Sequence, residues 1–300
     1  MTFGSNTTAT PIFATALGIG TFAAMDAFMK ALAIDIGAYN AILWRTCAAL
    51  CICGTAFLAL RIRWPAPAIL RIHIWRSLVV SLMAFLFFWG LRYVPLAEAI
   101  ALSFIAPLIA LYLAAVMLGE QIGRKAIGAS LLGFAGALVI VSGRFNEAIT
   151  TELGPGIGAI LLSAVLYAYN LILQRRQALL AGPVEIATFQ NGTILLVYAC
   201  FSPWFAVVPK ADHLPLIGGA ALLSLTSLML MAWAYARAQA KSLVSVEYTA
   251  FAWAALWGWL FFAEAVTATT VAGTGLIILG CLLALREPES PPVHTETTSL

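Results

Sequence analysis

Long apolar runs separated by short polar segments set the pattern of this chain. None of the runs alternates apolar and polar residues as a half-buried strand does. Most of them, read as helices rising about 1.5 Å per residue, are long enough to cross a hydrocarbon layer of about 30 Å. In lipid every backbone polar group must be paired internally, which favours helices. We therefore predict ten transmembrane helices, at about residues 11–34, 37–60, 72–92, 95–118, 125–143, 154–174, 183–208, 214–236, 243–262 and 268–285.

The composition supports a multi-pass membrane protein. The chain is 62% hydrophobic and 10% charged, whereas soluble domains have about 45–50% apolar and about 25% charged residues. The net charge of +3 is too small and too dispersed to indicate nucleic-acid binding. The five cysteines lie inside apolar runs with no histidine at ligand spacing. We expect no metal site and no cofactor.

The positions of the cations indicate an orientation. Residues 1–10 contain no Lys or Arg, so we expect no cleavable signal. With both termini in the cytoplasm, eleven of the 16 Lys and Arg residues fall at cytoplasmic loops or helix ends, and four at the outer ends. The positive-inside rule then favours cytoplasmic termini.

The two halves of the chain resemble each other at an offset of 144 residues. Paired residues include Pro11 and Pro155, Trp89 and Trp233, Glu120 and Glu264, and Gly136 and Gly280. Five helices per half is an odd number, so the second half must enter the membrane from the opposite face. We predict an all-α membrane protein built from two inverted five-helix repeats. The predicted parts are a cytoplasmic segment 1–10, repeats 11–143 and 144–285, and a disordered cytoplasmic tail 286–300.

Several of these features also mark a known family. The fourth helix of each half ends in a small residue and Glu, Gly119-Glu120 and Ala263-Glu264. Further features are Pro107 in helix 4, Arg45 in helix 2, Tyr248-Thr249-Ala250 in helix 9, and glycines in both fifth helices. In these features residues 11–285 resemble the EamA family of the drug/metabolite transporter superfamily.

The resemblance implies a bacterial inner-membrane carrier of small organic metabolites, with a central cavity lined chiefly by helices 1, 3, 4, 6, 8 and 9. Similar members export amino acids or carry S-adenosylmethionine, riboflavin or nucleotide-like compounds. The second half departs from the first, with Phe251 opposite Pro107 and Ala263 opposite Gly119. If Pro107 is a hinge, the two halves flex unequally.

Charged residues inside the predicted helices are the main candidates for function, because each costs roughly 2.5–3.5 kcal/mol at a helix centre. Asp26 and Arg45 each lie nine residues from the predicted first turn. We expect an ion pair between them, with direct substrate contact as the alternative. Asp26 and Lys30 map onto Asn170 and Gln174 at the repeat offset. These residues either form a central polar pocket or make interhelical hydrogen bonds.

Four glutamates leave alternatives open. Glu98 and Glu247 lie one turn inside helices 4 and 9. Either they are charges at helix ends near water, or one of them is a proton carrier or an amine-binding group. Glu120 and Glu264 are interpreted as structural residues that cap the following helix. Aromatic residues complete the cavity candidates, with membrane-interface anchoring as their alternative role. They are Trp89, Tyr112, Tyr167, Trp233 and Tyr248.

The sequence favours a monomeric secondary transporter that works by alternating access and exports amino acids or related metabolites. The alternative is an uptake carrier for a nucleoside-type or cofactor-like compound such as S-adenosylmethionine, riboflavin or a nucleotide. A channel-like or structural membrane protein is a more remote reading. An enzyme is disfavoured because the sequence has no HExxH motif and no convergent acid/base cluster.

Overall fold

The computed structural model describes residues 9–106, 108–110, 112–113, 124–143, 153–178, 180–235 and 249–284. Every regular element in these ranges is helical. The elements are α1 (Ala9–Ala59), α2 (Pro67–Gly90), α3 (Leu96–Ser103), α5 (Arg124–Ser142), α6 (Leu153–Ala178), α7 (Pro183–Phe205), the short 3-10 helix η1 (Ala211–His213), α8 (Leu214–Tyr235), α10 (Ala250–Phe262) and α11 (Ala268–Ala284).

Five of the described helices are long and apolar enough to cross a membrane. The first of them, Thr10–Ala59, has 50 residues, about twice what one crossing needs. It bends at Gly37, whose φ of 82° and ψ of 151° are not helical. This backbone conformation is open almost only to glycine, because a Cβ would clash with the main chain. The break matches the two predicted runs 11–34 and 37–60.

The predicted helix at 95–118 is broken in the structure. The helix α3 ends at Ser103, and a turn at Phe104 and Ile105 precedes the next helical residues. Pro107 follows this turn, and a proline cannot donate to the carbonyl four residues earlier. Pro107 itself lies outside the described residues, so its role as a hinge stays a prediction.

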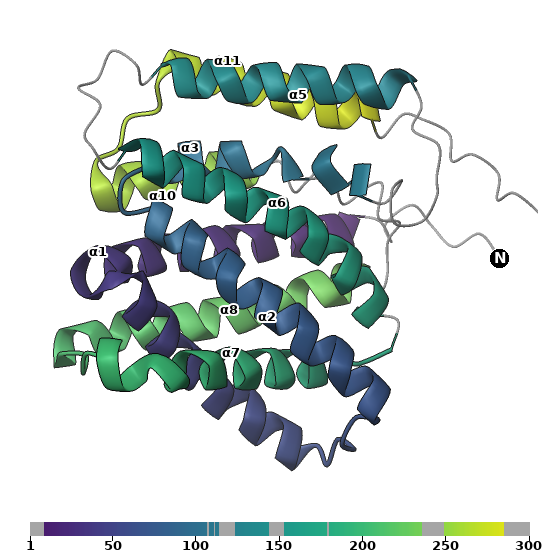
Figure 1. The fold of residues 1–300 in the computed structure, drawn as a ribbon, viewed down its shortest axis with the longest axis vertical. Coiled ribbons are helices and arrows are strands. Elements are labelled where there is room, and N and C mark those ends of the chain that lie inside the picture. The colour runs from purple at the N-terminus through teal and green to yellow at the C-terminus, as the bar shows by residue number, and fades with distance from the viewer. Residues whose placement is uncertain are drawn as a thin grey trace, which may run out of the picture.

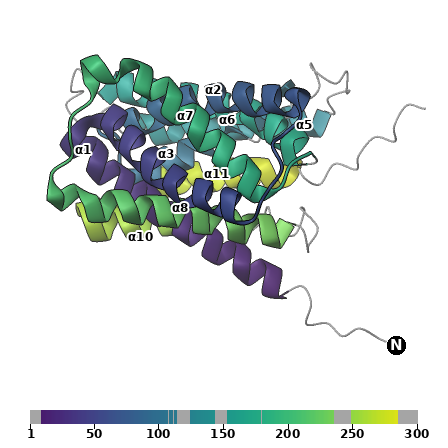
Figure 2. The ribbon, with the colours of Figure 1, turned by 90° about the horizontal axis from the view of Figure 1, so that it is seen from below.

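Helices from the first half of the chain pack on helices from the second half. The main pairs are α1 with α8, α2 with α6, α5 with α11, and α3 with α10. Figures 1 and 2 show α5 beside α11 along one side of the bundle. Figure 1 also shows the start of α1 and the end of α11 at the same end of the molecule.

The closest of these packings joins α5 and α11. A Cβ on Gly136 would lie 2.5 Å from the carbonyl oxygen of Gly273, and a Cβ on Gly273 would lie 2.5 Å from that of Gly136. Gly136 also faces Ile277 while Gly273 faces Ile140, so the two helices run in opposite directions. Close backbone approach of this kind stabilises helix pairs in lipid, where the hydrophobic effect between helices is absent.

The ends of the helices define two ends of the molecule. We call one the Gly37 end; it holds Gly37, the loop 91–95 after α2 and the loop 263–267 after α10. The other, the Pro65 end, holds the loop 60–66 before α2 and the loop before α7. In Figure 1 these are the left and right ends. Both ends carry buried polar side chains, described below.

We predict that Gly37→Ala destabilises the protein by about 1–3 kcal/mol, because alanine is strained at this φ and ψ. The matched control is Gly218→Ala in α8, where a Cβ would meet open space. Alanine should be neutral there, or stabilising by roughly 0.5–1 kcal/mol. Melting temperatures of the purified variants in detergent test this. Equal melting temperatures for the two variants would contradict the strain argument.

Candidate functional site

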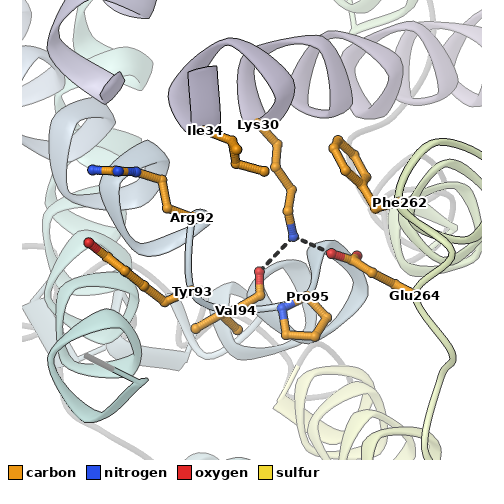
Figure 3. A pocket seen from close by; sticks show the side chains of 8 residues that line it. All are labelled: Lys30, Ile34, Arg92, Tyr93, Val94, Pro95, Phe262 and Glu264. Atoms are coloured by element: carbon orange, nitrogen blue, oxygen red, sulfur yellow. Dashed lines mark hydrogen bonds and ion pairs between the residues drawn. The ribbon is translucent and has the colours of Figure 1, made fainter. Parts of the chain in front are cut away.

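A cavity of about 350 Å³ opens at the Gly37 end, between α1, the loop after α2 and the end of α10. Figure 3 shows its lining. The lining residues are Lys30, Ile34, Arg92, Tyr93, Val94, Pro95, Phe262 and Glu264. The cavity therefore combines two cations, one carboxylate and two aromatic rings.

Lys30 is the most deeply placed charge of this cavity. Only 3% of the residue is exposed. Its ammonium donates a hydrogen bond of 2.9 Å to the carbonyl oxygen of Val94 and forms an ion pair with Glu264 (Figure 3). The ring of Phe262 lies 5.1 Å from the ammonium, within range of a cation–π contact. The charge of Lys30 is thus satisfied from two sides.

Glu264 reaches this position because α10 ends abruptly before it. Ala263 adopts the left-handed conformation, with φ of 52° and ψ of 31°. The second carboxylate oxygen of Glu264 accepts the backbone N–H of Leu96 at 2.8 Å. Leu96 begins α3, and the N-terminus of a helix stabilises a negative charge. Glu264 thereby ties α10, from the second half of the chain, to α1 and α3 from the first.

The Lys30–Glu264 pair is costly to separate. Breaking a buried pair leaves an uncompensated charge, at a cost of about 3–5 kcal/mol when the site stays dry. Here 18% of the Glu264 side chain is exposed, so water offsets part of that cost. We call this pair the latch, because it holds α1, α3 and α10 together at the Gly37 end.

A second polar cluster closes the Pro65 end. Arg76 on α2 donates to the Asn170 side-chain oxygen at 2.9 Å and to Gln177, both on α6. His73, which has no exposed surface, contacts Gln177 through Nδ1 and Glu185 on α7 through Nε2, at 3.1 Å for the latter. This Arg76 cluster joins α2 from the first half to α6 and α7 from the second.

The two clusters are far apart. From His73 to Gly90, just before the loop that holds Val94, the chain runs along α2 for 17 residues, which span about 26 Å. That distance is comparable to the hydrocarbon thickness of a membrane. The molecule therefore has one buried polar closure near each end, and each closure crosses between the two halves of the chain.

The predicted ion pair between Asp26 and Arg45 is wrong. Asp26 is 1% exposed, yet its Oδ2 and the Nε of Arg45 have no hydrogen-bond partner among the described residues. The physical reason is that the two arms of α1 pack on different helices, with Phe28 against Gly219 of α8 and Tyr39 against Tyr198 of α7. The two charges are near enough to interact electrostatically, but their side chains do not meet.

The interpretation of Glu264 as a cap of the following helix is also wrong, because it caps α3 and pairs with Lys30. The sequence analysis also did not single out His73 and Arg76, both of which are buried. A usable signal was present for Glu264. A cation such as Lys30 inside lipid requires a counter-ion, and the predicted topology puts Glu264 at the same membrane face.

The remaining candidates are spread over the structure. Glu98 is buried and accepts a hydrogen bond of 3.1 Å from the Thr270 hydroxyl. The ring of Trp89 meets the ring of Tyr93 edge-on at 5.1 Å. Asn170 is used in the interhelical bond to Arg76. Tyr112 is half-buried, whereas Tyr167 and Trp233 are more than a third exposed. Glu120, Glu247, Tyr248 and the 286–300 tail lie outside the described residues, so their predictions stay open.

Comparison with known proteins gives a consistent result. The model of the EamA-like transporter family matches residues 9–142 and again 154–286. A pseudopaline exporter of Pseudomonas aeruginosa is 27% identical over 89% of this chain and 92% of its own length. A riboflavin transporter of Rhizobium johnstonii is 29% identical over 71% and 70%. A crystal structure whose description names no activity aligns over 93% of this chain and 96% of its own, with a TM-score of 0.60 and 20% identity.

We predict direct coupling between Lys30 and Glu264. Lys30→Met, Glu264→Gln and the double variant form a thermodynamic cycle, in which Glu264→Gln keeps an acceptor for the Leu96 N–H but removes the charge. The losses of stability in the two single variants should sum to more than the loss in the double variant. The difference, the coupling energy, should be about 1–3 kcal/mol. Unfolding of the four proteins measures it. Additive effects would show that the latch does not exist.

Proposed function

The chain belongs to the EamA-like transporter family, and from this premise we propose a specific mode of action. The protein is a secondary transporter that moves a small organic metabolite across the bacterial inner membrane by alternating access. Its two family segments are inverted five-helix repeats, which give ten crossings with both termini in the cytoplasm. It exports amino acids or related metabolites.

The observation that carries this proposal is the pair of polar closures at opposite ends. Alternating access requires that each end opens while the other stays shut. The Lys30–Glu264 latch and the Arg76 cluster each join one half of the chain to the other half. A rocking motion of one half against the other would break one closure and leave the second intact.

The packing of the helices supports the inverted arrangement. α5 and α11 are the fifth helices of the two predicted repeats, and they run in opposite directions where Gly136 meets Gly273. The other principal pairs also combine one helix from each half. The start of α1 and the end of α11 lie at the same end (Figure 1), which supports termini on one side of the membrane.

The named relatives support transport and differ on the solute. The exporter aligns over most of this chain and over most of its own length, which supports export. The riboflavin transporter supports a cofactor-like solute. Such a solute belongs to the second candidate, an uptake carrier for a compound such as riboflavin, a nucleotide or S-adenosylmethionine. A solute assay in both directions separates the two candidates.

We predict countertransport by the purified protein in proteoliposomes. Vesicles preloaded with unlabelled solute should take up labelled solute of the same kind faster than empty vesicles, for at least one member of a panel of amino acids, riboflavin, nucleosides and S-adenosylmethionine. The acceleration follows because a carrier reorients faster when loaded at both faces. Flux that does not saturate and shows no acceleration would indicate a channel.

We also predict that covalent closure of either end stops transport. In a background without the native cysteines, Lys30→Cys with Glu264→Cys gives two thiols across the Gly37 end, and His73→Cys with Glu185→Cys gives two across the Pro65 end. The contacting atoms lie at the tips of long side chains, so a reducible bis-thiosulfonate reagent is used to span the gap between the thiols. Cross-linking should abolish countertransport in both proteins and reduction should restore it. The single-cysteine variants are the controls. Transport that continues in either cross-linked protein would exclude alternating access through that end.

A further inference from the structure

Two opposite charges on α1 lack partners in the bundle. Within the part of the chain that the structure describes, three buried side-chain polar atoms have no hydrogen-bond partner. One is Oδ2 of Asp26, one is Nε of Arg45, and the third is the indole nitrogen of Trp257. Arg45 makes one weak contact, from Nη2 to the Thr46 hydroxyl at 3.4 Å. Two of the three unpartnered atoms thus belong to opposite charges on the two arms of one helix.

The charges of Asp26 and Arg45 interact electrostatically over a distance. Their side chains form no ion pair and no hydrogen bond with each other. The neighbouring polar groups are used elsewhere. Lys30, one turn along the same face from Asp26, is held by Glu264, and the hydroxyl of Tyr198 near Arg45 donates to the Ser81 carbonyl at 3.0 Å.

The face of α1 that carries Asp26 points into the bundle. Phe22, Asp26 and Lys30 are spaced four residues apart and share this face. Lys30 lies against α3 and α10, while Phe22, nearer the Pro65 end, is 49% exposed.

The same positions in the second half are fully satisfied. At the offset of 144, Asp26 corresponds to Asn170 and Arg45 to Phe189. Asn170 accepts from Arg76, and Phe189 packs edge-on against Trp64 at 4.9 Å and stacks on His73. The fold can therefore fill these positions with bonded or apolar groups, and only the first half leaves two charges there.

Buried polar atoms without partners are costly, and a ligand with complementary groups would satisfy both Asp26 Oδ2 and Arg45 Nε. We propose that Asp26 and Arg45 are the two poles of a binding site for a zwitterion. The Asp26 carboxylate accepts hydrogen bonds from the ammonium of the ligand, and the Arg45 guanidinium donates to its carboxylate. The ligand class is a compound that carries both groups a few bonds apart, as an amino acid does. This inference rests on the proposed transport function and names the residues that select its substrate.

A site of this kind also joins the two arms of α1. One pole lies before the bend at Gly37 and the other after it, so a bound zwitterion bridges the bend. A ligand with only one of the two charges would leave the other pole unpaired in the bundle. The site should therefore discriminate strongly against compounds that carry an amine or an acid alone.

The test uses the full-length protein in lipid nanodiscs and three pools at equal concentration: the common L-amino acids, the corresponding decarboxylated amines, and the corresponding deaminated acids. The amino-acid pool should raise the melting temperature of the wild type, and the other two pools should not. Asp26→Asn and Arg45→Gln should lose this response, with half-saturation weakened on the order of 10- to 100-fold. Asp35→Asn, the same substitution at an exposed carboxylate of α1, should keep it.

Several results would overturn the site. It fails if no amino-acid response is seen in the wild type, if a single-charge pool stabilises equally, or if Asp26→Asn responds like the wild type. Size-exclusion profiles and ligand-free melting temperatures show whether each variant is folded. Arg45→Lys, which keeps the charge, should retain part of the response if Arg45 binds the ligand.

Failure of the site and failure of the transport function give different patterns. If the zwitterion response is absent while countertransport of another solute is observed, the transporter stands and the site is wrong. If the response is present and no solute shows countertransport, the site stands and the transport function is wrong.

Discussion

The structure depends on one constraint: polar groups inside lipid must find their partners within the protein. The constraint explains why the described backbone is helical, and why its charged side chains are gathered near the helix ends. Lys30 reaches both a carboxylate and a carbonyl oxygen, and Arg76 reaches two side-chain amides. Asp26 and Arg45 are the exceptions among the described charged residues, because each keeps a buried polar atom that has no partner in the bundle.

The satisfied and the unsatisfied charges differ in what they connect. The satisfied clusters each cross between the halves of the chain, so they hold the halves together. The unsatisfied Asp26 and Arg45 lie on the two arms of α1, within one half, and Asp26 is one turn from the satisfied Lys30. Under the mechanism that we propose, the contacts between the halves break in turn, and the solute supplies the partners that Asp26 and Arg45 lack.

The duplicated halves are not used equally. Asn170 at the position of Asp26 is bonded to Arg76, and Phe189 at the position of Arg45 belongs to an aromatic cluster with Trp64 and His73. Where α5 and α11 touch, the contact is made by Gly136 and Gly273, which are not paired at the offset of 144. The two halves have therefore diverged both in their polar chemistry and in the residues that make this contact.

The sequence by itself determined which segments are helical and that the solvent is lipid, since both follow from run length and from the cost of unpaired backbone groups. It also identified Asp26, Lys30, Arg45 and Asn170 as informative, because any charge or amide within an apolar run is costly. Only the tertiary structure decided which of these residues meet. The packing of the two arms of α1 on different helices kept Asp26 from contacting Arg45, and the left-handed Ala263 turned Glu264 toward Lys30. Such pairings depend on helix rotation and on single backbone angles, which the spacing of residues along the chain does not encode.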